Sequence, residues 1–174
     1  MIAQKRKVLF VCTGNTCRSP MAEYYFNYAI KAIQKESEKF GTDTNFDITA
    51  ESRGLCAENG CNMSSNAKKV LSMNNIVGDI SDINHKSRQI DEEIVRESAL
   101  IYGITVHHDA RLKEEFPEYK DKILSMPENI GDPYGGSLEV YEKCFENIRR
   151  SVDIIIKSLT GVPEVPEEME GNIK

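Results

Sequence analysis

The sequence predicts an α/β protein built on an open parallel sheet. Short apolar segments alternate with longer segments of helical spacing, which is the pattern of a sheet covered by helices. The first apolar segment, Lys7 to Val11, shows no polar alternation, as expected of a strand buried on both faces. The last helical segment repeats apolar residues at three- and four-residue spacing from Leu138 to Leu159. Ligands bind such sheets beyond the carboxyl ends of the strands, where Cys12 lies.

The first half of the chain contains a further predicted strand and two predicted helices. Ser19-Pro20 supplies a capping hydroxyl and a proline at the first helical position, so a helix is expected over residues 19–39. Gly41 ends it. Strand character returns over residues 46–50, and a serine pair caps a second helix over residues 64–71.

The second half continues the alternation of helices and strands. Residues 91–97 are predicted to be helical, and residues 100–102 form another buried strand. A short helix over residues 110–116 stops at the following proline, and residues 123–124 form a fourth strand. The helix that begins at Leu138 follows.

Composition indicates one globular domain. A chain of 174 residues, 40% of them hydrophobic, has material for one sizeable core, so we expect one domain over residues 1–160. The acidic stretch 161–174, with two prolines, is expected to be a disordered tail. A net charge of -6 argues against a nucleic-acid partner, because phosphate backbones attract basic surfaces.

The chain is expected to be cytoplasmic. No apolar stretch approaches the length of a membrane span, and the run after the basic N-terminal residues is too short for a secretion signal. The cysteines are therefore expected to be mostly thiols. We expect no cofactor and no metal, because the C-x4-C pair lacks further ligands. The five cysteines are Cys12, Cys17, Cys56, Cys61 and Cys144.

The segment after the first strand has the composition of a phosphate-binding loop. Backbone N–H groups of a tight loop can converge on phosphate oxygens, and glycine and asparagine tolerate the dihedral angles this requires. The N-terminus of the following helix adds partial positive charge. Besides Cys12, the predicted loop consists of Thr13, Gly14, Asn15, Thr16, Cys17 and Ser19.

Side chains of this segment suit phosphoryl transfer. The positive field favours a thiolate at Cys12, which is the nucleophilic form. Arg18 offers a bidentate clamp for phosphoryl oxygens, and Ser19 can donate a hydrogen bond to the sulfur. A C-x5-R spacing alone also arises by chance, and an ordinary core cysteine is the alternative. The full run from Cys12 to Pro20, set between a strand and a helix, favours the phosphate loop.

A candidate acid precedes the last helix. Asp132 lies in the segment Asp-Pro-Tyr-Gly, where Pro133 stiffens the loop. Beside a phosphate dianion a carboxyl group tends to stay protonated, as an acid catalyst requires. Tyr134 is a candidate wall for the substrate side chain. Alone, the segment is an ordinary turn.

Together these residues resemble the low-molecular-weight protein phosphatases. The resemblance rests on the segment from Val8 to Glu23, on residues 132–135, and on the order of elements over residues 5–160. It implies a three-layer fold of four parallel strands flanked by helices. It also implies Cys12 as nucleophile, Arg18 as transition-state clamp, and Asp132 as acid and then base.

The resemblance extends to supporting residues with two departures. Ser52 and His85 resemble residues that brace Asn15 and the loop, although a surface histidine is the alternative for His85. Residues 74–83 form a longer stretch than in typical members. Residues 105–108 lack the usual methionine-acid pattern, so the rim of the pocket is expected to differ.

The loop most resembles that of the bacterial protein-arginine phosphatases. Tyrosine-directed members commonly carry an aliphatic residue where this chain has Thr16. A hydroxyl there suits the polar guanidinium of phosphoarginine, whose N–H groups an apolar side chain would leave unpaired. Tyr134, where arginine-directed relatives often have phenylalanine, weakens this preference. A phosphorylated protein is the expected partner, and phosphotyrosine is the alternative substrate.

Two other functions fit less well. Thioredoxin-coupled arsenate reductases share a similar loop, but they need relay cysteines in the middle of the chain, and none lies between Cys61 and Cys144. A phosphoprotein-binding module without turnover would have little need for Cys12, Arg18 and Asp132 together.

The resemblance also suggests a redox switch. We expect peroxide to convert Cys12 to a sulfenic acid, which condenses with the Cys17 thiol to form a disulfide. A cellular reductant then reduces this disulfide back to two thiols. After peroxide treatment, a reductant should restore wild-type activity more fully than that of Cys17→Ser. Equal recovery of the two proteins would contradict the switch.

Overall fold

The computed structural model describes residues 6–41 and 46–162 and contains a four-stranded parallel sheet of order β2-β1-β3-β4. The strands are β1 (Arg6–Cys12), β2 (Ile48–Gly54), β3 (Leu100–Gly103) and β4 (Ile123–Ser125). The chain moves from β1 to β2 on one side and later returns to β3 on the other, so the order reverses at β1. The carboxyl end of β1 is therefore the switch point at which such sheets bind ligands.

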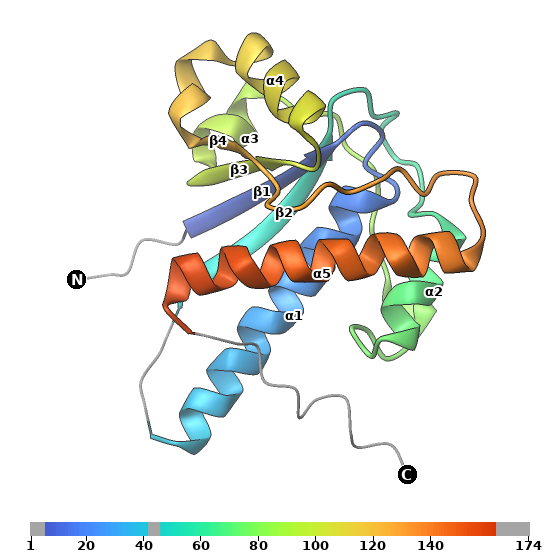
Figure 1. The fold of residues 1–174 in the computed structure, drawn as a ribbon, viewed down its shortest axis with the longest axis vertical. Coiled ribbons are helices and arrows are strands. Elements are labelled where there is room, and N and C mark those ends of the chain that lie inside the picture. The colour runs from blue at the N-terminus through green and yellow to red at the C-terminus, as the bar shows by residue number, and fades with distance from the viewer. Residues whose placement is uncertain (1–5, 42–45, 163–174) are drawn as a thin grey trace.

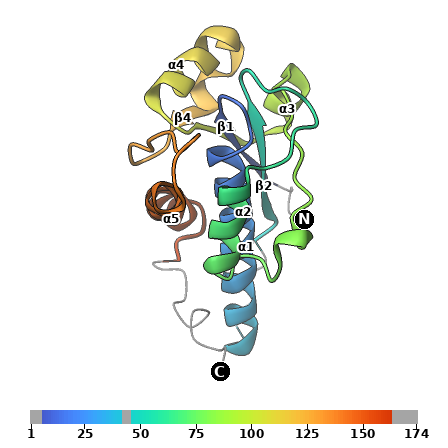
Figure 2. The same ribbon diagram turned by 90° about the vertical axis from the view of Figure 1, so that its right-hand side faces the viewer.

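Helices cover both faces of this sheet, which gives the expected three layers (Figures 1 and 2). Helices α1, α2 and α5 pack on one face, and α3 and α4 pack on the other. Their bounds are α1 (Arg18–Lys39), α2 (Ser65–Met73), α3 (Glu92–Glu97), α4 (Val106–Glu115) and α5 (Leu138–Thr160). Short 3-10 turns lie at η1 (Ile80–Asp82) and η2 (Pro117–Lys122).

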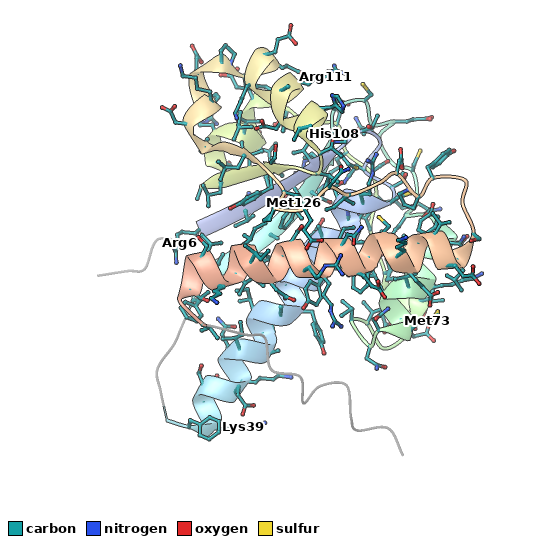
Figure 3. All side chains as sticks on the ribbon, in the orientation of Figure 1. Arg6, Lys39, Met73, His108, Arg111 and Met126 are labelled. Carbon is teal, nitrogen blue, oxygen red and sulfur yellow. The ribbon has the colours of Figure 1, made fainter. Side chains whose placement is uncertain are left out.

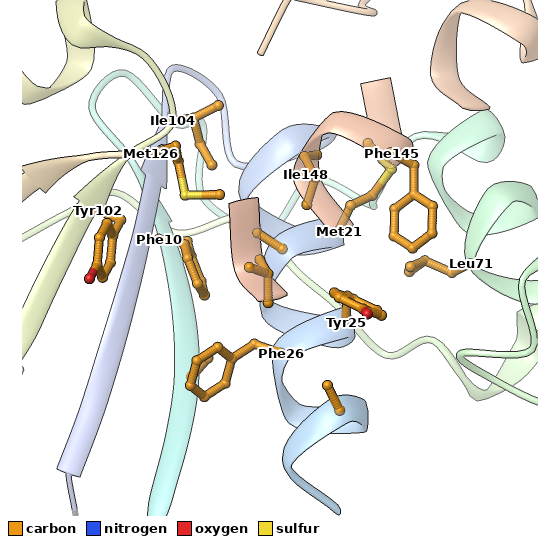
Figure 4. Close-up of a cluster of buried hydrophobic side chains, with 14 of the residues drawn as sticks. Phe10, Met21, Tyr25, Phe26, Leu71, Tyr102, Ile104, Met126, Phe145 and Ile148 are labelled. Carbon is orange, nitrogen blue, oxygen red and sulfur yellow. The ribbon is translucent and has the colours of Figure 1, made fainter. Parts of the chain in front are cut away.

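Alternate residues of β1 supply two separate cores. Phe10 faces the larger core, where its ring meets Phe26 edge to face at 5.9 Å between centroids (Figure 4). Leu9 and Val11 face the smaller core under α3 and α4. Both faces of β1 are fully covered, which explains its uninterrupted apolar sequence.

Several predicted boundaries were wrong. Helix α1 begins at Arg18, so Ser19 is not its cap and its hydroxyl is available to the phosphate loop. Strand β2 runs from Ile48 to Gly54 instead of over residues 46–50, since pairing with β1 carries it past the apolar stretch. Helix α4 begins at Val106 instead of residue 110, because Thr105 caps it.

Other boundaries agree closely with the prediction. Ser64 caps α2 through the N–H of Ala67, and a left-handed Gly161 ends α5. The predicted tail lies outside the described residues beyond Val162. Within residues 6–41 and 46–162, no helix combines the length and apolar character that a membrane span requires.

Candidate active site

The end of β2 clamps the loop that follows Cys12. Gly54 lies so close that a Cβ on it would be 2.6 Å from the carbonyl oxygen of Thr13 and 3.0 Å from the amide nitrogen of Asn15. Beyond Gly54, the N–H groups of Leu55 and Cys56 donate to the carbonyls of Cys12 and Thr13, each at 2.9 Å. Only glycine permits this approach, and the backbone bonds hold the start of the loop against the sheet.

Asn15 shapes the loop with a left-handed backbone, at φ 55°. Its side chain is fully buried and uses all of its polar atoms. The Arg88 backbone N–H donates to Asn15 Oδ1 at 2.9 Å, which fixes the orientation of the amide group. Asn15 Nδ2 then donates to Ser19 Oγ at 3.0 Å and to Ser52 Oγ at 2.9 Å.

These contacts determine where the serine protons point. Because Asn15 Nδ2 can only donate, both hydroxyl oxygens act as acceptors toward it. Ser52 sends its own proton to the Glu23 carboxylate at 2.5 Å. The Ser19 proton is left for Cys12 Sγ at 3.0 Å or for the carbonyl of Arg53 at 3.3 Å. The Asn15 backbone N–H also donates to Cys12 Sγ, at 3.3 Å.

Two ionisable side chains support this network from behind. The His85 ring lies 2.8 Å from the Asn15 carbonyl through Nε2, which must carry a proton because a carbonyl only accepts. Burial lowers the pKa of His85, which favours the neutral ring. Burial has the opposite effect on the acidic group and raises the pKa of Glu23, although the hydrogen bond from Ser52 opposes this shift. His85 is thus buried beside the loop and is not a surface histidine.

Arg18 and Asp132 meet at the mouth of the loop. The Arg18 guanidinium, only 6% exposed, lies 3.0 Å from Asp132 Oδ2. The Asp132 side chain is 57% exposed, and its other oxygen accepts the backbone N–H of Tyr134 at 3.2 Å. Tyr134 is 77% exposed, and its role as a wall for the substrate stays a prediction.

The remaining loop side chains point in different directions. Thr16 is half-buried, with its hydroxyl 3.7 Å from Cys17 Sγ. Cys17 Sγ lies 3.3 Å from the hydroxyl of Tyr141, whose pKa is raised to about 12 mainly by burial. Both Cys12 and Cys17 are buried free thiols, and the disulfide between them stays a prediction.

Sequence reasoning missed three residues around the loop. Glu23 belongs to the recognised segment but received no role. Arg88 acts through its backbone N–H, and such a contact cannot be predicted from the residue type. His108, only 8% exposed, lies 3.0 Å from Thr13 Oγ1 through Nε2. The Thr105-to-His108 spacing is that of a helix cap, and this signal was available in the sequence.

The site contains no ligand set for a metal among the described residues, where no group of three or more histidine, cysteine or acidic side chains converges. Its polar groups converge instead on a buried thiol at a helix N-terminus, with a guanidinium and a carboxylate opposite. The fold and site define a cysteine-dependent phosphatase.

Comparison with known proteins specifies the family. Residues 7–162 match the model for low molecular weight phosphotyrosine protein phosphatase, and the chain belongs to this family. It is 31% identical to a protein-arginine-phosphatase of Geobacillus stearothermophilus over 88% of this chain and 95% of the relative. It is 30% identical to the low molecular weight protein-tyrosine-phosphatase PtpB of Staphylococcus haemolyticus, over 82% of this chain and 91% of the relative.

Solved structures agree with this assignment. The YwlE arginine phosphatase from Geobacillus stearothermophilus superposes with a TM-score of 0.73 at 28% identity, over 97% of this chain and 99% of that one. A Cys-to-Ser mutant of YwlE carries a phosphorylated active-site serine. Its TM-score is 0.70 at 26% identity, over 88% of this chain and 95% of that one. These structures confirm the predicted fold and support cysteine-based catalysis.

His108 gives the site a testable pH dependence. Burial, with a contribution from the Arg18 cation, lowers the pKa of His108 from 6.5 to about 4. The unfolded chain therefore binds this proton at higher pH than the folded chain does. The stability that His108 contributes is complete above pH 6.5 and is lost as pH falls to about 4.

Glutamine at this position cannot titrate. As pH falls from 6.5 to about 4, we therefore expect the melting temperature of His108→Gln to fall less than that of wild type. Thermal unfolding of both proteins at stepped pH measures the difference. His85 titrates in both and cancels in the comparison. Parallel decline of the two melting temperatures would contradict the assignment.

Proposed function

We propose that this chain is a protein-arginine phosphatase that acts through a phosphocysteine at Cys12. The observation that carries the mechanism is a pair of contacts made by loop residues: the Ser19 hydroxyl lies 3.0 Å from Cys12 Sγ, and the Arg18 guanidinium lies 3.0 Å from the Asp132 carboxylate. Nucleophile, sulfur-stabilising donor, cationic clamp and acid are the groups that phosphoryl transfer through an enzyme thiolate needs.

In the first step the Cys12 thiolate attacks phosphorus and the bond from phosphorus to the leaving nitrogen breaks. Loop N–H groups and the Arg18 guanidinium hold the phosphoryl oxygens, whose negative charge is spread in the transition state. Asp132 gives its proton to the departing guanidine nitrogen. The contact of 3.0 Å between the Asp132 carboxylate and the Arg18 guanidinium supports this role.

In the second step water hydrolyses the phosphocysteine. Asp132, now a carboxylate, takes a proton from the attacking water as the bond from phosphorus to sulfur breaks. Ser19 donates to the departing sulfur, and this requires its proton to point at Cys12. The bond from Asn15 Nδ2 occupies the Ser19 oxygen as an acceptor, which leaves the Ser19 proton for Cys12 Sγ at 3.0 Å or for the Arg53 carbonyl at 3.3 Å.

Phosphoarginine is preferred because of Thr16. Its half-buried hydroxyl adds a polar group to the loop, where guanidinium N–H groups would otherwise meet an apolar wall. Relatives named protein-arginine-phosphatase in two bacilli support this choice. Relatives of similar identity are named tyrosine phosphatases, and the exposed ring of Tyr134 suits an aromatic substrate, so phosphotyrosine is the second candidate.

Asp132→Asn tests the acid. On a phosphoarginine peptide we expect kcat/KM to fall by about 100-fold or more, because the basic leaving group departs poorly without a proton. On p-nitrophenyl phosphate the fall should be much smaller, since that leaving group departs as a stable anion. Glu128→Gln, which alters a carboxylate paired with Arg150 outside the site, is the matched control. Equal losses on both substrates would exclude Asp132 as the acid.

Thr16→Ile tests the substrate. Catalytic efficiency is measured on phosphoarginine and phosphotyrosine peptides of matched sequence, with Cys12→Ser as the inactive reference. We expect wild type to prefer phosphoarginine and the variant to lose about tenfold or more of that preference. A wild-type preference for phosphotyrosine would overturn the arginine assignment, and activity that survives Cys12→Ser would overturn the mechanism.

A further inference from the structure

Helix α4 is joined to the phosphate loop through His108. The imidazole is buried, and its Nε2 lies 3.0 Å from the hydroxyl oxygen of Thr13, the first residue after Cys12. Figure 3 labels His108 near the start of α4. The loop is thus held from the α4 side as well as by the end of β2, and this second contact has no part in the steps described above.

The hydrogen bonds determine the tautomer of His108. The backbone N–H of Thr105 lies 3.2 Å from Nδ1 and can only donate, so Nδ1 must hold a lone pair. The Thr105 hydroxyl, 2.8 Å from Nδ1, then donates to it as well. A neutral imidazole with an unprotonated Nδ1 carries its proton on Nε2. His108 therefore donates to Thr13 Oγ1, and the hydroxyl oxygen of Thr13 is the acceptor.

The charges around His108 also favour the neutral ring. Burial is the largest cause of the lowered pKa of His108. The charges of Arg18, His107 and Arg111 lower the pKa further, and the charge of Asp132 opposes them. A proton on Nδ1 would in addition face the Thr105 N–H and break the helix cap. The rim of the site consequently keeps an uncharged donor next to Arg18 at neutral pH.

Thr13 is left with hydrogen-bonding capacity at the mouth of the loop. Its side chain is exposed, and within residues 6–41 and 46–162 its hydroxyl makes no second hydrogen bond. The bond from His108 holds the oxygen in place and leaves one lone pair and the hydroxyl proton for the substrate. A guanidinium offers only donors, so it needs such an acceptor, whereas a phenyl ring does not.

We propose that His108 is a positioning residue that holds the Thr13 hydroxyl oxygen as an acceptor for the guanidinium N–H groups of phosphoarginine. This inference rests on the proposed function and adds a second element of specificity to Thr16. The neutral state of the ring matters here too, because an imidazolium at this place would repel the cationic leaving group.

A variant series separates the two ends of the imidazole. His108→Asn retains an acceptor at the position of Nδ1 for the Thr105 cap but does not reach Thr13. His108→Gln places an N–H donor where Nε2 lies, and it should restore the bond to Thr13. Thr13→Val removes the acceptor itself. Melting temperatures of all variants report whether α4 stays folded against the sheet.

The measurement is kcat and KM on matched phosphoarginine and phosphotyrosine peptides. We expect Thr13→Val and His108→Asn each to lower kcat/KM on phosphoarginine by about tenfold and on phosphotyrosine by less than twofold. The double variant should be no worse than either single one, because both remove the same contact. His108→Gln should recover most of the loss.

Each outcome decides the matter. Equal losses on both substrates, additive losses in the double variant, or no loss at all would overturn the positioning role while leaving the proposed function intact. A wild-type protein that hydrolyses only phosphotyrosine would overturn both, since no guanidinium would then need the acceptor.

Discussion

The active site depends on the left-handed backbone of Asn15 and the hydrogen bonds that hold it. This conformation is unfavourable for an L-residue by about 1–2 kcal/mol, although asparagine tolerates it better than most. The Asn15 backbone N–H in this turn points to Cys12 Sγ, at 3.3 Å. The Asn15 side chain and carbonyl are held by Ser19, Ser52, Arg88 and His85, each at 3.0 Å or less. The strained turn persists because its surroundings over-determine it.

The same network reaches the nucleophile. Arg88 orients the Asn15 amide, and the amide in turn orients the hydroxyls of Ser19 and Ser52. The Glu23 carboxylate accepts the hydrogen bond that Ser52 donates, so the series of hydrogen bonds ends at Glu23. A buried network of this kind is favourable only when every member is satisfied, and here the side-chain polar atoms of Asn15, Ser19 and Ser52 all have partners. The cluster therefore leaves the Ser19 proton for Cys12 Sγ or for the Arg53 carbonyl.

The other side of the loop carries the proposed substrate contacts, and His108 of α4 holds Thr13 there. There the hydroxyls of Thr13 and Thr16, the Arg18–Asp132 pair and the ring of Tyr134 surround the mouth. Relatives of similar identity are named for arginine and for tyrosine substrates. The proposed selectivity rests on this side of the loop, where polar acceptors would distinguish a guanidinium from a phenyl leaving group.

Local pattern in the sequence determined the strand at Lys7 to Val11, the long C-terminal helix, the cysteine loop and the candidate acid, because each depends on neighbours in the chain or on residue type. The three layers follow from the alternation of these elements. Sequence alone misplaced the start of α4, since its first turn is polar and depends on a cap instead of an apolar face.

Only the tertiary structure brought Arg88 to Asn15, across 73 positions, and His108 to Thr13, across 95. No local pattern encodes such pairs. Their geometry arises from the order of the strands, which gathers loops from distant parts of the chain at the carboxyl end of β1.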